Sequence, residues 1–161
     1  MRNKRRIFWA AAMRDLREDE APDEAPDGVR EERLRATSGL LRGLDLTSWR
    51  GRSGRRYVVG VHPLTEGELL DVTEAVILAV RRDADGAARL VAAAAAGPEL
   101  RPQARRAWIA RVKSRGASEL HIHRLAAGAS ERAAIVADLQ DDVGEEPALT
   151  APLRAAPGPG R

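Results

Sequence analysis

The fold of this chain is decided by residues 74–95, which read EAVILAVRRDADGAARLVAAAA. Apolar residues fill both faces of Glu74–Arg82, as in a strand that is covered on its two sides. Asp85-Gly86 supports the positive φ angles of a tight turn, and Ala87–Ala95 supplies the returning strand. The stretch therefore predicts a β-hairpin within a sheet.

Further elements are predicted on either side of this hairpin. They are a strand at Arg55–His62, a short helix begun by a capping box at Thr65–Glu68, a helix at Pro102–Arg115, a strand at Glu119–Leu125, and a helix at Glu131–Leu139 capped by Ser130. The expected fold is α+β. It has a four-stranded, mainly antiparallel sheet in the order β-β-β-α-β-α, with the helices packed on one face.

Three regions follow from this assignment. Residues 47–140 are expected to form the α+β domain, which begins with a loop at Thr47–Gly54. Residues 1–46 form an N-terminal extension, with helices at 5–17 and 29–44 and an acidic, proline-containing linker between them. Residues 141–161 are rich in Pro, Gly and Ala, a composition typical of a disordered tail.

The composition excludes several kinds of site. Cysteine is absent from the 161 residues, so disulfides, thiolate metal sites and a cysteine nucleophile are ruled out. The basic start and the apolar run Ile7–Met13 imitate a signal peptide, but Arg14 ends the run and no small-residue cleavage site follows. No apolar run approaches the roughly 18 residues of a membrane span. We expect a bacterial-type cytoplasmic protein, and its many alanines and arginines are typical of a GC-rich genome.

The net charge of +3 is unevenly distributed along the chain. Arginines gather before the first predicted strand and along the helix at 102–115, where phosphate groups could be bound by charge and reach alone. The candidate nucleic-acid-binding residues are Arg52, Arg55, Arg56, Arg105, Arg106, Arg111, Lys113 and Arg115. Only Trp49 and Tyr57 are available nearby to stack on bases. A solvated helix face is the alternative interpretation of the same charges.

The three histidines are weak candidates for a metal site. His121 and His123 are two residues apart on a predicted strand, so their side chains share one face, and His62 on another strand is the only possible third imidazole. The alternative is that Leu120 and Ile122 face a helix while the histidines occupy the other, partly wet face. Asp83, Asp85 and Glu74 are carboxylates near one turn, and the Asp-Gly turn itself explains the two aspartates.

The order of elements from Arg89 to Leu125 is similar to the core of the GNAT acetyltransferases, in which a strand, a phosphate-binding loop and a helix hold coenzyme A. The loop Arg101–Ala107 has no glycine, and Pro102 lacks an N–H donor for a pyrophosphate. The same order also resembles the ribonuclease-H-like core, which carries carboxylates on its first strand. Arg55–His62 has none.

The sequence thus favours a small accessory or regulatory binding protein, without cofactor, that contacts nucleic acid through its basic helix. One alternative is a divergent acyltransferase-like enzyme that uses His121 or His123. Another is an adaptor that docks on a partner protein through the amphipathic helix expected at 5–17.

Overall fold

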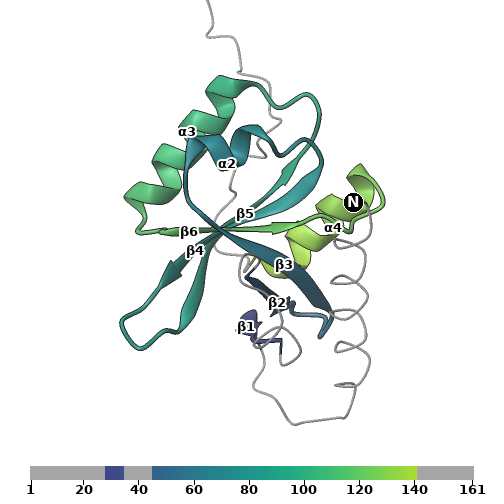
Figure 1. Cartoon of the computed structure of the whole chain (residues 1–161). Helices are drawn as coiled ribbons and strands as arrows, with labels where there is room; N and C mark the ends of the chain where they lie inside the picture. Colours follow the sequence, from purple (N-terminus) through teal and green to yellow (C-terminus); the bar gives the residue numbers. More distant parts are fainter. Residues whose placement is uncertain (1–27, 35–44, 141–161) are drawn as a thin grey trace, which may run out of the picture.

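A computed structural model of the chain describes residues 28–34 and 45–140. Within these residues, antiparallel strands form one curled sheet, a half-barrel, with the strand order β1-β2-β3-β6-β4-β5 (Figure 1). The strands are β1 Arg30–Glu32, β2 Leu46–Arg50, β3 Arg56–Pro63, β4 Ala75–Arg82, β5 Ala88–Ala96 and β6 Glu119–His123. The helices are α2 Glu66–Leu70, α3 Pro102–Ser114 and α4 Ala129–Leu139. No helix in these ranges combines the length and apolarity that crossing a membrane requires.

The expected four-stranded sheet is wrong, because β1 and β2 extend it to six strands. β1 lies in a segment expected to be helical, and β2 lies in one expected to be a loop. The polar residues of β2 obscured the strand. Their hydroxyls find backbone partners on β1, since Thr47 Oγ1 and Ser48 Oγ both donate to the Glu32 carbonyl, at 3.3 and 2.9 Å.

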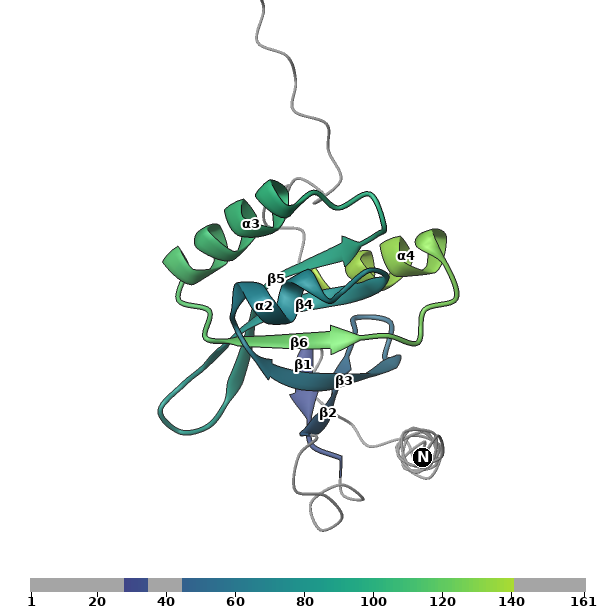
Figure 2. The same ribbon diagram turned by 45° about the horizontal axis from the view of Figure 1, so that its top comes forward.

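The helices lie on both faces of the sheet, and the expectation of one covered face is also wrong. One face carries Ile77 and Leu120 under α2 and α3, around the buried Trp108. The opposite face carries Leu78 beneath α4 and beside Trp49 of β2. Figure 2 shows α2 and α3 on one side of β6 and strands β1 and β2 on the other. Successive side chains of β4 point to opposite faces, so its continuous apolar run needs cover on both sides.

Several local predictions are confirmed. Strands β4 and β5 form the predicted hairpin, and Gly86 in its turn has a φ of 85°. Thr65 caps α2, since its hydroxyl accepts from the Glu68 N–H at 3.4 Å. The helix α3 starts at Pro102, and Gly116 just after its end has a φ of 89°.

The predicted cap of the last helix is wrong, and other predictions fall outside the described residues. Helix α4 begins at Ala129 with Gly128 as its N-cap, so Ser130 lies inside the helix. The helix expected at 5–17, most of the acidic linker, residues 35–44 of the second helix and the tail at 141–161 lie outside the described ranges.

The β2–β3 turn is attached to the end of α4 by the carboxylate of Asp138. This group accepts hydrogen bonds from Ser53 N at 2.8 Å, Ser53 Oγ at 2.7 Å and the Tyr57 hydroxyl at 2.8 Å. Gly51 lies directly against it, and a Cβ at this position would lie 2.6 Å from Asp138 Cγ. A residue without a side chain is therefore required for the carboxylate to reach its three donors.

We predict that Gly51→Ala lowers the free energy of unfolding by about 1–3 kcal/mol, because Asp138 must move and leave its donors unpaired. Urea denaturation of the full chain measures this change. Gly67→Ala is the matched control, because a Cβ added to this residue of α2 would meet no atom within 4 Å. In a helix this change removes backbone entropy from the unfolded chain and stabilises by roughly 0.5–1 kcal/mol. Equal stability of the Gly51→Ala variant and the parent would contradict the requirement for glycine at this position.

Candidate functional site

Arg105, a candidate phosphate ligand, is buried and has a structural role. Only 6% of the residue is exposed, and its guanidinium donates to the carbonyls of Leu69, Leu70 and Leu100. The first two carbonyls lie at the end of α2, where backbone acceptors lack helical partners. Arg105 therefore joins α3 to α2 and is not available to a ligand.

The other basic residues of α3 are exposed. Arg106 forms an ion pair with Glu66 of α2, with 3.3 Å between Nε and Oε2. Arg111, Lys113 and Arg115 lie in or just after the last turn of α3. Cations at this end also interact favourably with the helix dipole, which places partial negative charge there.

The arginines before β3 do not join those of α3. Arg52 donates to the carbonyl of Ala137 at 2.6 Å, and Arg56 forms an ion pair with Glu32 at 2.6 Å. Arg55 is exposed at the start of β3, whereas α3 contacts α2, which follows the end of that strand. The two groups of candidates therefore lie at opposite ends of β3.

Two arginines that were not predicted from the sequence extend the α3 group. A Cβ added to Gly116 would lie 3.4 Å from Cδ of Arg81 on β4, so the hairpin passes beside the end of α3. Arg89 is the register partner of Arg81 and lies on the same face. We call these two arginines and the basic residues around the last turn of α3 the basic corner, which consists of Arg81, Arg89, Arg111, Lys113 and Arg115. The sequence could have indicated these two arginines, because both lie beside the predicted hairpin turn.

Acidic side chains near the hairpin serve the turn and its arginines. Asp83 forms ion pairs with Arg81 at 3.3 Å and Arg89 at 2.7 Å, and hydrogen bonding to Arg89 lowers the pKa of Asp83. Asp85 accepts from the N–H of Ala87 at 3.1 Å, as expected in such a turn. Glu74 lies apart from them and faces Arg132. The structure therefore does not bring these carboxylates together.

The three histidines do not meet. His62 is paired in register with Leu120, and His121 with Val61, so His62 and His121 point to opposite faces of the sheet. His62 is instead bonded to Glu68, with Nδ1 and Oε2 3.0 Å apart. Across residues 28–34 and 45–140, no group of three or more His, Asp or Glu is arranged to hold a metal.

His121 is fully buried and belongs to a polar chain inside the half-barrel. Trp49 Nε1 donates to His121 Nδ1 at 3.0 Å, and His121 Nε2 lies 3.0 Å from Glu119 Oε2. Arg82 then joins Glu119, at 2.7 and 2.8 Å, to Glu31, at 3.1 and 3.2 Å. We call this series the inner polar chain. It connects strands β2, β6, β4 and β1.

The partners of the inner polar chain determine its charge states. Since Nδ1 of His121 accepts a hydrogen bond, its proton is on Nε2 and is donated to Glu119, which gives a neutral ring. Burial lowers the pKa of His121 despite the nearby carboxylate of Glu119. Hydrogen bonding to Arg82 lowers the pKa of Glu119, and the same contact raises the pKa of Arg82. A buried neutral imidazole with both nitrogens bonded stabilises the fold and is not exposed to a substrate.

His123 is also buried and neutral, contrary to the expectation of a partly wet face. Its Nδ1 donates to the Val58 carbonyl at 2.8 Å, and its ring meets Tyr57 edge to face with centroids 5.7 Å apart. Burial lowers the pKa of His123. The predicted separation of the histidines from Leu120 and Ile122 is nevertheless present, because these two residues pack toward α3.

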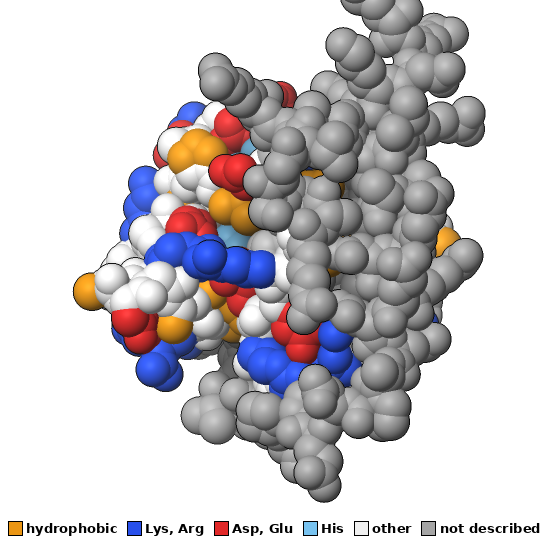
Figure 3. Space-filling view, turned by 60° about the horizontal axis from the view of Figure 1, so that its bottom comes forward, with side chains coloured by type: hydrophobic (Ala, Val, Ile, Leu, Met, Phe, Trp, Pro, Cys, Tyr) orange, Lys and Arg blue, Asp and Glu red, His pale blue; other side chains and the backbone are white. Residues whose placement is uncertain are grey.

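Many arginines of the described surface are engaged with carboxylates. Glu32 alone forms ion pairs with Arg30, Arg50 and Arg56, at distances of 2.8, 2.7 and 2.6 Å. Burial would raise the pKa of Glu32, but the hydrogen bond and the charges of these arginines lower it overall. Figure 3 shows basic side chains in blue beside acidic ones in red on the face that it presents. The number of arginines therefore overestimates the positive charge that the surface carboxylates leave uncompensated.

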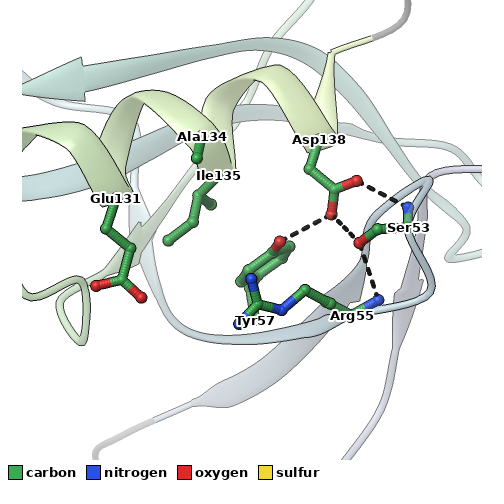
Figure 4. A pocket seen from close by; sticks show the side chains of 7 residues that line it. All are labelled: Ser53, Arg55, Tyr57, Glu131, Ala134, Ile135 and Asp138. Carbon is green, nitrogen blue, oxygen red and sulfur yellow. Dashed lines mark hydrogen bonds between the residues drawn. The ribbon is translucent and has the colours of Figure 1, made fainter.

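A small pocket lies between the β2–β3 turn and α4 (Figure 4). One wall is formed by Ser53, Arg55 and Tyr57, and the other by a helical stripe of Glu131, Ala134, Ile135 and Asp138. Burial raises the pKa of Tyr57 to about 12, and its hydrogen bond to Asp138 acts in the same direction. The phenol therefore remains a donor at neutral pH. Arg55 and Tyr57 were candidates from the sequence, but the facing helix residues were not.

No protein-family model, curated protein or solved structure matches this chain. The antiparallel pairing of the described sheet also limits the topological resemblances. The helix α3 connects β5 to β6, and β4 lies between these two strands. The similarity to the GNAT core therefore extends no further than the order of elements along the chain.

The buried histidines make stability depend on pH. Burial holds the pKa of His121 and His123 below its ordinary value, so near pH 6.5 the unfolded chain binds protons that the folded chain does not. We predict that the free energy of unfolding falls as pH is lowered from about 7.5 to 5.5. Each histidine contributes at most about 1.4 kcal/mol per pH unit. Urea denaturation at several pH values measures the slope.

His121→Gln tests the assignment, because an amide can keep both hydrogen bonds without titrating in this range. We expect a smaller slope for this variant. Gly67→Ala, which changes no titratable group, is the control and should keep the parent slope. Glu119 and Asp138, whose pKa values are lowered, affect stability only nearer their ordinary range of about 4. Equal slopes in His121→Gln and the parent would show that His121 does not contribute.

Proposed function

We propose that this chain is an accessory protein that binds nucleic acid through the basic corner. The supporting observation is the closeness of Arg81 to Gly116, where an added Cβ would lie 3.4 Å from the Arg81 Cδ. It means that the basic residues at the end of α3 and those of the β4–β5 hairpin lie near one another. We also propose a cytoplasmic location, where nucleic acid is present. The absence of cysteine from the sequence is compatible with that reducing compartment.

The chemistry of the basic corner supports phosphate binding. Its guanidinium groups can form bidentate hydrogen bonds with phosphate oxygens, and Lys113 adds a flexible point charge. Arg81 and Arg89 are 48% and 67% exposed, so they can reach a ligand while remaining close to Asp83. Exposed ion pairs contribute little energy, and a polyanion can therefore displace Asp83 at small cost.

The nearby aromatic residues do not add a stacking surface. Trp49 and Trp108 are fully buried, and Tyr57 is 7% exposed. Binding through the basic corner would thus depend on charge and be strongly weakened by salt, because each neutralised phosphate releases counterions. His121 and His123 are buried, so a substrate could not reach them. Their burial therefore does not support the alternative of an acyltransferase that uses these histidines. The adaptor alternative rests on a helix that lies outside the described residues.

We predict that the double variant Lys113→Glu and Arg115→Glu weakens binding of a labelled mixed DNA and RNA pool by about tenfold or more. It should also reduce the slope of log affinity against log salt concentration by roughly 2, since about two phosphate contacts are lost. Fluorescence anisotropy at low and physiological salt measures both quantities.

The matched control is Arg101→Glu with Arg106→Glu. It reverses the same number of positive charges, but at the opposite end of α3. Arg101 directly precedes the helix and Arg106 lies near its start, and both residues are exposed. We expect this variant to bind within about threefold of the parent. An equal loss in both variants would show that net charge alone is responsible. No binding by the parent at low salt would refute the proposed function.

A further inference from the structure

The pocket beside α4 has the dimensions of a site for a small molecule. Its volume is about 180 Å³, which is below the roughly 300–1,000 Å³ of pockets that hold drug-sized ligands. Its two walls are joined by the hydrogen bonds of Asp138 to Ser53 and Tyr57 (Figure 4). The walls are therefore held in place before any ligand enters.

Arg55 is the cation of this pocket. The neighbouring Arg50 and Arg56 both bind Glu32, and Arg52 donates to a carbonyl of α4. In the described part of the chain, the guanidinium of Arg55 has no carboxylate or carbonyl partner. Figure 4 shows its side chain running along the pocket beside Tyr57. A guanidinium in this position is suited to a bidentate bond with a ligand carboxylate.

Glu131, in the first turn of α4, supplies the opposite charge of the lining. One of its oxygens, Oε2, accepts from the N–H of Ala127, which fixes the side chain over the start of α4. The second oxygen can accept from a ligand ammonium group. Asp138 is not equivalent to Glu131, because its two oxygens already accept three hydrogen bonds from the β2–β3 turn.

Apart from Ser53 and Asp138, the rest of the pocket lining is apolar. It consists of the ring of Tyr57 and the side chains of Ala134 and Ile135. Such a surface favours an apolar group, while the two flanking charges would repel a ligand that presented the wrong end. A lining of this kind is more complementary to a zwitterion with an apolar part than to a simple anion or cation.

We propose that this pocket binds a small zwitterion of the amino-acid class with an apolar side chain. The ligand carboxylate lies on Arg55, its ammonium on Glu131, and its side chain on Tyr57, Ala134 and Ile135. This proposal is independent of nucleic-acid binding, since the residues of the basic corner do not line the pocket.

The test uses the full chain and three probes of one shape: leucine, isocaproate without the ammonium, and isoamylamine without the carboxylate. Binding is followed by isothermal titration calorimetry and by NMR shifts of residues 53–57 and 131–138. We expect leucine to bind about tenfold or more tightly than either analogue, because each lacks one charge-assisted hydrogen bond.

Two variants assign the charges. Arg55→Gln should bind leucine no better than isoamylamine, and Glu131→Gln should bind it no better than isocaproate. Glu131→Gln keeps an oxygen for the Ala127 N–H, and both positions are exposed, so both variants should fold. Arg124→Gln, which changes an exposed arginine outside the pocket, is the control and should bind leucine as the parent does. The proposal is overturned if leucine shifts no pocket resonance, or if Arg55→Gln binds leucine with the affinity of the parent.

Discussion

The hydrogen bond from Trp49 to His121 is the interaction on which the curled sheet most depends. It joins β2 to β6 across the inside of the half-barrel, although β3 lies between these strands. Arg82 extends the connection from Glu119 on β6 to Glu31 on β1. Strands β1 and β5 contact each other without a backbone ladder, so side chains hold the sheet in its curl. In this low-dielectric interior such bonds are strong, and the loss of one partner leaves another buried group unpaired.

The same arrangement explains what the sequence did and did not predict. The hairpin at 75–96, the capping of α2 by Thr65 and the bounds of α3 follow from local rules of turn chemistry and capping, which require no knowledge of neighbours. Strand β2 does not follow from them. Its Thr47 and Ser48 are typical of a loop, and they belong to a strand only because β1 supplies an acceptor for their hydroxyls.

The candidate sites show the corresponding limit for function. Pattern reasoning placed His121 and His123 on one face and separated them from Leu120 and Ile122, as the structure does. It could not show that the sheet curls over the histidines, since the curl depends on residues as far apart as Glu31 and Arg82. Likewise Arg105 and Arg111 look equivalent in sequence, but one is buried against α2 and the other is exposed. Charge counts therefore identified the helix and not the residues available on it.

The shortness of β1 affects how copies of this chain can associate. It pairs with β2 over three positions, and its acidic side chains bind arginines of β2, β3 and β4. By this pairing β1 covers the backbone groups of β2 that a bare edge strand would offer to a second molecule. A short outer strand with charged side chains is itself a poor template for pairing, so its length and its charges both guard against edge-to-edge association of copies.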